Sequence, residues 1–236
     1  MNHTLEVIFQ RRAIKVFDPV EIPRDTREQI LNAARVAPSS SNSQPYRFYW
    51  LESAEIRGQA AHLCMGQIPA RTASVLVVAV ADLGSWQSTA QSHLEWMRSA
   101  GFSPDKIEEF EHKSKLAKLF FIQGWFGILG ALKWSICRLL GIWKIIGTPP
   151  VARHGLFKWA TKSAALACEN MMIAAEALGL NTCPMEGFDA RRLSRFLGLS
   201  RRDHEIVMVI AIGKKSARYV DQPQWRRPLD ATVTIL

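Results

Sequence analysis

The sequence of 236 residues lacks the features that mark several protein classes. Its four cysteines are widely separated and form no C-x-x-C pair, which disfavours a redox dithiol and fits reduced, buried thiols in a cytosolic protein. The histidines show no metal-ligand spacing, so we expect no metal site. No G-x-G-x-x-G joins an expected strand to an expected helix, and this excludes a Rossmann cofactor domain. No basic segment followed by an apolar run opens the chain, so we expect a cytoplasmic protein without a secretory signal.

Acidic residues are the scarcest charged type, and they leave a formal net charge of +9. The basic residues are scattered, without a helix-turn-helix, finger or RNA-binding signature, so we predict no nucleic-acid partner. A phosphate-bearing cofactor or an anionic membrane surface is a better partner for such a chain. Residues 112–167 contain no Asp or Glu at all. The cations inside this stretch are Lys113, Lys115, Lys118, Lys133, Arg138, Lys144, Arg153, Lys158 and Lys162.

Hydrophobic and charged fractions of 48% and 22% are ordinary for a globular protein, and no internal repeat divides the chain. We therefore predict a single domain over residues 1–236. A continuous apolar run at residues 74–81 predicts a strand that is buried on both faces. Further strands are expected at residues 48–51 and 205–213, and the expected helices are 5–10 with Thr4 as N-cap, 23–37, 54–65, 87–99, 103–118, 162–178 and 190–197. Long helices between strands favour an α+β architecture.

The most informative stretch is residues 37–48, which read APSSSNSQPYRF. Four serines, an Asn and a Gln between two prolines predict a rigid polar loop, held between a helix and a strand. Gln44 and Pro45 are expected to brace this loop. Two other segments accompany it, RRAIKVFD at residues 11–18 and CPMEGFD at residues 183–189.

These three segments resemble, in the same order, the signatures RRSxRxF, APSSxNxQPWxF and PxEGF of the nitroreductase family. That resemblance implies a central mixed β-sheet surrounded by helices, an intertwined homodimer, and FMN as the cofactor. It implies hydride transfer from NADH or NADPH to a hydrophobic nitroaromatic or quinone-like acceptor by a ping-pong mechanism. Two alternatives stay open: a dehalogenase-type or flavin-cleaving enzyme of the same fold, and a membrane-associated flavin-binding protein without turnover.

The resemblance also assigns cofactor-binding residues. Arg11 and Arg12 match positions that hold the FMN phosphate and ribityl chain, and an arginine fork suits a phosphate. Ala13 stands where the family has Ser, so one hydroxyl contact is missing. Lys15 matches a basic position near the flavin pyrimidine, and Arg226 matches an arginine of the tail that closes on the phosphate.

Two further groups complete the implied site. The loop residues Pro38, Ser39, Ser40 and Asn42 match positions that contact the FMN of the partner subunit. Pro184, Met185, Glu186 and Gly187 match the turn over the flavin, where the backbone N–H of Glu186 would lie near N5 and Gly187 would allow close approach. No protein side chain is assigned a catalytic role, because the flavin does the chemistry. The family's usual polar and basic pair before the central strand is not evident in residues 65–69.

Residues 116–147 match the family poorly and are apolar and basic. The apolar run at residues 119–132 is shorter than the ~20 residues that a transmembrane helix needs. Two interpretations remain: a lid over the active site and dimer, which we favour, or an interfacial helix on an anionic membrane. Either one indicates a hydrophobic acceptor, because a large exposed apolar patch is otherwise a liability.

Overall fold

An antiparallel sheet organises the molecule, for which we describe residues 2–121, 124, 128–146, 150 and 152–236 of a computed structural model. β5 (His204–Lys215) pairs with β3 (Val75–Asp82), with β4 (Asn181–Met185) and with β1 (Phe17–Asp18). β2 (Tyr46–Leu51) extends the sheet from β3. A parallel bridge between Ala13 and Thr182 gives the sheet its mixed character. The α+β class predicted from the sequence is confirmed.

The core lies on both faces of β3, in which all eight residues are buried. Val75, Val77 and Ala79 belong to one apolar cluster, and the alternate residues Leu76 and Val78 belong to another. Successive side chains of a strand point to opposite faces, so this division follows from the strand geometry. The prediction of a strand buried on both sides is confirmed.

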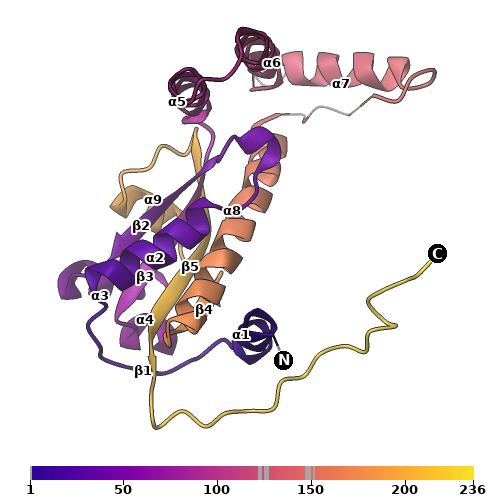
Figure 1. Cartoon of the computed structure of the whole chain (residues 1–236). Helices are drawn as coiled ribbons and strands as arrows, with labels where there is room; N and C mark the ends of the chain where they lie inside the picture. The colour runs from indigo at the N-terminus through magenta and orange to yellow at the C-terminus, as the bar shows by residue number, and fades with distance from the viewer. Residues whose placement is uncertain (1, 122–123, 125–127, 147–149, 151) are drawn as a thin grey trace.

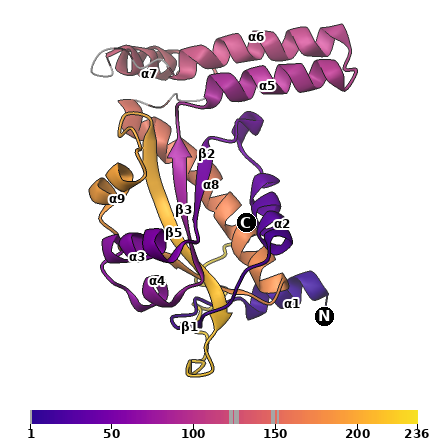
Figure 2. The same cartoon turned by 90° about the vertical axis from the view of Figure 1, so that its left-hand side faces the viewer.

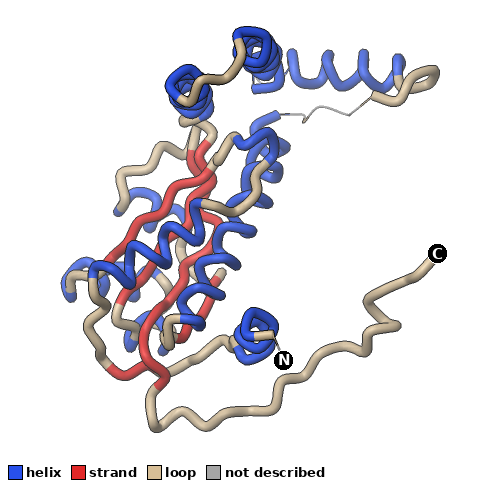
Figure 3. The backbone as a smooth tube through the Cα atoms, viewed as in Figure 1, coloured by secondary structure: helices blue, strands red, loops and turns tan. Residues whose placement is uncertain are grey.

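Helices cover each face of the sheet (Figure 1, Figure 3). α2 (Arg24–Arg35) and α8 (Ala152–Ala177) lie on one face, and α3 (Ala54–Leu63), α4 (Ile68–Thr72) and α9 (Ala190–Phe196) lie on the other. The small side chains of α8 let its backbone approach the sheet and α2 closely. Ala167 and Ala175 of α8 are buried in the same apolar cluster as Ala34 of α2.

Four local predictions need correction. α1 (His3–Gln10) is capped by Asn2, whose side chain accepts the N–H of Thr4, so the prediction of Thr4 as N-cap was wrong. α8 begins at Ala152, ten residues before the expected start, because Leu156 and Phe157 are buried in a third apolar cluster. β4 and α4 were not expected at all.

Three helices form an arm beyond the end of β3. α5 (Trp86–Ser99) and α6 (Pro104–Phe121) lie side by side across the top of the molecule, and α7 (Ile128–Leu140) continues away from the sheet (Figure 1, Figure 2). The rings of His93 and Phe110 join α5 to α6, with centroids 4.4 Å apart. Among the helices in the described part of the chain, none has the length and apolarity to cross a bilayer.

The C-terminal residues 217–236 form an extended tail that leaves the body (Figure 1). Its apolar side chains lie in solvent, with Val220, Trp225 and Leu229 each about three quarters exposed. Such side chains are ordinarily covered in a soluble protein, so the tail has the composition of a segment that packs on another surface.

Candidate functional site

The basic N-terminal segment lies along β4. The backbone N–H of Ile14 donates to the carbonyl of Thr182 at 2.9 Å, and Ala13 bridges the same residue. The ammonium of Lys15 donates to Sγ of Cys183 at 3.3 Å. Burial raises the pKa of the Cys183 thiol, and Lys15 opposes this shift only in part. The thiol therefore stays protonated and neutral beside the Lys15 side chain.

The two arginines of this segment meet the C-terminal tail. Nη1 of Arg12 donates to the carbonyl of Gln222 at 2.6 Å, and the amide of Gln224 donates to the carbonyl of Arg11 at 3.2 Å. Nε of Arg11 lies 3.4 Å from a carboxylate oxygen of Glu169 on α8. The tail thus reaches the segment that the sequence assigned to phosphate binding. The guanidinium of Arg226 donates to the carbonyl of the neighbouring Trp225.

The turn after β4 is fixed by a glutamine that the sequence interpretation missed. Pro184 and Met185 lie within β4, and Glu186 and Gly187 follow as an exposed turn. Nε2 of Gln67 donates to the carbonyl of Gly187 at 2.6 Å and to the carbonyl of Cys64 at 3.1 Å.

A side chain at position 187 would crowd the Gln67 amide, because an added Cβ would lie 3.0 Å from Nε2. Gln67 belongs to the segment 65–69, in which no match to the family was found. The sequence does offer one indication of Gln67: it is a polar residue two positions before Pro69, at the N-cap of a short helix.

The polar loop is held by hydrogen bonds within itself. Ser40–Asn42 forms a single 3-10 turn, and Ser41 and Asn42 have positive φ values of 54° and 49°. Gln44 braces the loop, because its backbone N–H donates to Oγ of Ser39 at 3.0 Å and its amide donates to Oδ1 of Asn42 at 3.1 Å. The carbonyl of Pro45 accepts the N–H of Asp82 at 3.0 Å. Pro38, Ser40 and Asn42 are exposed, while Ser39 is half-buried.

One chain does not bring the loop and the basic segment together. The loop leads into Tyr46, which pairs with Ala81 near the C-terminal end of β3. The basic segment bridges Thr182, which pairs with Ile212 opposite Val75 at the other end of β3. Six residues of strand, at about 3.4 Å each, separate these ends by about 20 Å. The polar loop and the basic segment therefore lie near opposite ends of β3, while Met185, which pairs with Val209 opposite Val78, places the turn after β4 between them.

A cavity of about 350 Å³ lies beside the loop, within the range of small-molecule sites. Its wall combines Ser41 and Asn42 of the loop with Trp86, His93 and Phe110 of α5 and α6. This cavity offers flat aromatic surfaces next to exposed polar atoms. It is suited to a small aromatic molecule.

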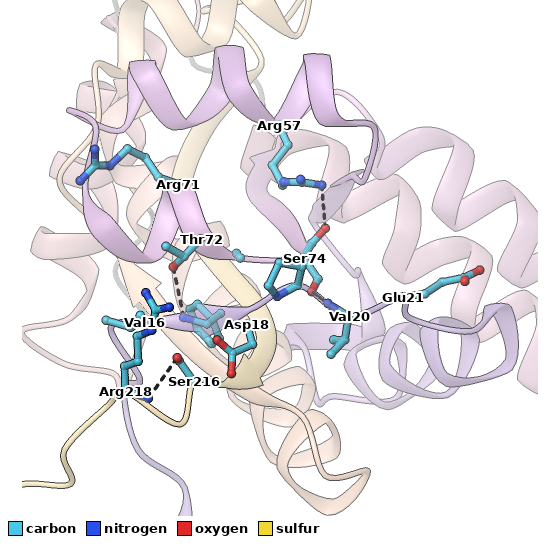
Figure 4. A pocket seen from close by; sticks show the side chains of 13 residues that line it. Val16, Asp18, Val20, Glu21, Arg57, Arg71, Thr72, Ser74, Ser216 and Arg218 are labelled. Carbon is cyan, nitrogen blue, oxygen red and sulfur yellow. Dashed lines mark hydrogen bonds between the residues drawn. The ribbon is translucent and has the colours of Figure 1, made fainter.

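A larger hollow of about 640 Å³ lies at the junction of β1, α4 and β3 (Figure 4). Its polar groups serve the fold: Nη1 of Arg57 donates to the carbonyl of Ser74, and the N–H of Val20 donates to the hydroxyl of Ser74. Figure 4 shows Arg71 pointing away from Arg57, so their charges do not converge. None of the predicted site residues lines this hollow.

The chemistry of the groups along β4 fits a phosphate-bearing planar cofactor. Arg11, Arg12 and Lys15 belong to one short segment beside β4, and the same strand leads into a turn whose Gly187 is exposed. The hydroxyl of Thr182 is buried there without a hydrogen-bond partner among the described residues. A buried hydroxyl without a partner is uncommon in proteins, and it marks a position where a bound group can supply one.

Comparison with known proteins finds relatives over nearly the whole chain. Protein DrgA of Synechocystis sp. is 28% identical over 225 residues, which cover 95% of this chain and 88% of that protein. The NADH dehydrogenase of Thermus thermophilus is 25% identical over 239 residues, covering 99% and 98%. A protein from Exiguobacterium sibiricum, crystallised in complex with FMN, superposes with a TM-score of 0.74 at 21% identity, covering 98% of this chain and 96% of that one.

The model of the Nitroreductase family matches residues 8–128 and 150–214. The matched residues include the basic segment, the polar loop, Gln67 and the turn after β4. They exclude residues 129–149, which contain most of α7. The chain belongs to the nitroreductase family.

Proposed function

We propose that this protein is an FMN-dependent oxidoreductase that passes hydride from NADH or NADPH to a small hydrophobic nitroaromatic or quinone-like acceptor. The observation that carries the proposal is the cationic segment Arg11–Lys15, hydrogen-bonded along β4 beside the Pro184–Gly187 turn. A family relative named for NADH oxidation and a structural relative crystallised with FMN support the same activity. Bound FMN supplies the hydride-transfer chemistry, and a ping-pong order follows if donor and acceptor use the same face in turn.

The basic segment would bind the anionic part of the cofactor. Arg11 and Arg12 bind the phosphate, since each guanidinium carries five donors and the described contacts use only a few of them. Ala13 offers its backbone in place of a hydroxyl. Lys15, held by Cys183, places a positive charge near the flavin pyrimidine, where negative charge develops on reduction. Arg226 would close on the phosphate by a rearrangement of the exposed tail.

The turn would position the reactive edge of the ring. Gln67 anchors the carbonyl of Gly187, so the backbone N–H of Glu186 is presented in one orientation. Pro184 and Met185 hold the turn to β5 through the β4 ladder, opposite Ile210 and Val209. A preorganised donor of this kind costs no rearrangement during the reaction.

We also propose that the functional unit is a homodimer. The loop residues Pro38, Ser39, Ser40 and Asn42, of which all but Ser39 are exposed, would complete the FMN site of the partner subunit. The separation of about 20 Å between loop and basic segment in one chain supports this arrangement. Exposed apolar side chains outside α7 supply surface for the contact, including Phe9 at 61% and Val36 at 72% exposure.

The acceptor would occupy the aromatic cavity beside the loop. Trp86, His93 and Phe110 offer stacking surfaces, and the loop that lines the same cavity would face the partner's flavin. The shape and composition of the cavity favour a flat, hydrophobic acceptor.

Subunit complementation tests the proposal and its shared site. One chain carries Arg11→Ala and Arg12→Ala, and a second, differently tagged chain carries Ser40→Ala and Asn42→Ala. Each variant alone is expected to lose FMN. Each is also expected to fold, because the partly exposed ion pair and hydrogen bonds that it removes contribute little to stability. Random mixing yields about half heterodimers, each with one intact site, and so restores about a quarter of the wild-type flavin content.

The control is a mixture of wild-type chain with the double variant Arg191→Gln and Arg195→Gln on α9, which is expected to keep full flavin content. Flavin absorbance per chain after size-exclusion chromatography is the measurement. Wild-type flavin content in the Arg11→Ala, Arg12→Ala variant would remove the assigned phosphate site. Loss of flavin in both variants without recovery in the mixture would place the loop and the arginines in the same subunit's site.

A further inference from the structure

α7 presents an apolar face that none of the described residues covers. Its exposed aliphatic side chains follow a helical period of three and four residues, so they lie on one side of the helix. These residues are Ile128, Leu129, Leu132, Ile136, Leu139 and Leu140, with exposed fractions between 46% and 63%. Gly130 and Cys137 lie on the other side, where Gly130 is buried and α7 contacts α8.

The charges around this face have one sign. No acidic residue occurs between positions 112 and 167, while Lys133, Arg138 and Lys144 accompany α7. The guanidinium of Arg138 lies 5.7 Å from the ring centroid of Trp134, and Trp143 just after the helix is 79% exposed. Tryptophan beside lysine and arginine, around an aliphatic stripe, is the composition of a helix that lies in a membrane interface.

The dimensions of α7 favour lying on a bilayer over crossing it. Thirteen residues span about 20 Å, whereas the hydrocarbon core is about 30 Å thick. In the views of Figures 1 and 2, α7 lies at the outer edge of the molecule, away from the sheet. A flat surface can therefore reach the helix without meeting the body first.

A second copy of the chain is a weaker candidate for covering this face. The match of the family model ends at residue 128 and resumes at residue 150, so α7 beyond Ile128 lies outside the matched residues. Two copies of α7 packed face to face would bring like charges together without an acidic partner. Anionic headgroups complement the same cations and accept the aliphatic side chains below them.

We propose that α7, with residues 141–145 after it, is a peripheral membrane-binding element for bilayers that contain anionic lipid. Ile142 and Ile145, at 67% and 108% exposure, would insert beside Trp143. Binding to lipid does not depend on the enzyme activity proposed above. One consequence rests on that activity: an acceptor dissolved in the bilayer, such as a lipophilic quinone, would reach the flavin from the membrane side.

Vesicle co-sedimentation of the full-length protein tests the proposal. Vesicles of phosphatidylcholine alone are compared with vesicles that contain about one third phosphatidylglycerol, at salt concentrations of about 0.05 M and 0.5 M. The expected result is sedimentation with the anionic vesicles at low salt and release at high salt. Flavin absorbance of the same samples reports the cofactor separately, so a failure of lipid binding is distinguishable from a failure of the proposed function.

Two double variants of α7, each with a matched control elsewhere in the chain, test whether binding depends on α7 itself or on the total charge and hydrophobicity of the protein. Arg138→Gln with Lys144→Gln is expected to weaken partitioning about 30-fold, at roughly 1 kcal/mol per basic residue. Its control, Arg191→Gln with Arg195→Gln, removes the same charge from α9 and should weaken binding less than threefold, by the long-range field alone.

Leu132→Gln with Leu139→Gln keeps good helix formers and is expected to weaken binding about tenfold or more. Its control, Ile56→Gln with Ile68→Gln, removes comparably exposed aliphatic side chains from α3 and α4 and should not change binding. Two results would overturn the proposal. One is no sedimentation of the wild type with any vesicle; the other is equal losses in the α7 variants and their controls. A change of oligomeric state by the leucine pair in the absence of lipid, without sedimentation of the wild type, would assign the face to a second copy.

Discussion

β3 and α7 use the same kinds of side chain for opposite purposes. In β3, valine, leucine and alanine lie between two layers of helices, and every residue is buried. In α7, leucine and isoleucine follow a helical period, and six of them are about half exposed. Hydrophobic content alone therefore says little about a segment. The periodicity of its apolar residues, and whether other elements pack on them, decide whether the segment builds the core or a docking surface.

The largest expected difference between β3 and α7 is in how much the same substitution lowers the free energy of unfolding. Leu76 is fully buried in β3, and Leu76→Ala should lower the free energy of unfolding by about 3 kcal/mol, because it removes packed methyl groups and leaves a cavity. Leu139 on α7 is 61% exposed, and Leu139→Ala should change it by less than about 0.5 kcal/mol.

Urea denaturation of both variants and the wild type, followed by circular dichroism, measures the difference. The same chemical change at both positions makes each variant the control for the other. Equal destabilisation by the two variants would mean that the α7 face is covered in the folded protein, and it would break the comparison.

Thiol reactivity gives a smaller expected difference, between the core of the protein and α7. Burial raises the pKa of Cys64 to about 11 and that of Cys168 to about 12, and it also raises the pKa of Cys183. The thiolate is the reactive form, so these three thiols are protonated as well as shielded near pH 8. Cys137 on α7 is half-buried. We expect one fast-reacting thiol per native chain.

Titration with a chromogenic disulfide such as Ellman's reagent, near pH 8, measures the number of fast thiols. Cys137→Ser should remove the fast phase, while the denatured wild type should show four thiols. Persistence of a fast phase in Cys137→Ser would place a reactive thiolate in the body of the protein, against the assigned burial.

The fold was predictable where the signal was local. The continuous apolar run defined β3, and Asp189 with Gly198 framed α9 correctly, since Asp189 accepts the N–H of Arg192 and Gly198 has a positive φ. β4 escaped prediction because Pro184 and few strand formers hide it. It is a strand because it pairs with β5. Contacts distant in sequence, not propensity, decide such elements.

The sequence predicted which segments belong to the candidate site, but not how these segments are arranged in space. The basic segment lies beside β4, the strand that leads into the turn, and the roles assigned to both remain predictions. Gln67 was missed because it accepts no role from its neighbours alone: its amide donates to the carbonyls of Cys64 and Gly187, and Gly187 comes close only in the folded chain. The distance between the polar loop and Arg11 depends on the strand register, which a sequence pattern alone does not fix.

The proposal that this chain is a flavin oxidoreductase is tested most directly by the absorbance spectrum of the purified protein. The account predicts a yellow protein with a flavin band near stoichiometric occupancy, which bleaches on anaerobic addition of NADH or NADPH. It further predicts that a quinone or nitroaromatic added afterwards restores the band. A colourless protein that takes up no FMN would contradict the account, and a bound flavin that neither nicotinamide bleaches would leave a flavin-binding protein without this activity.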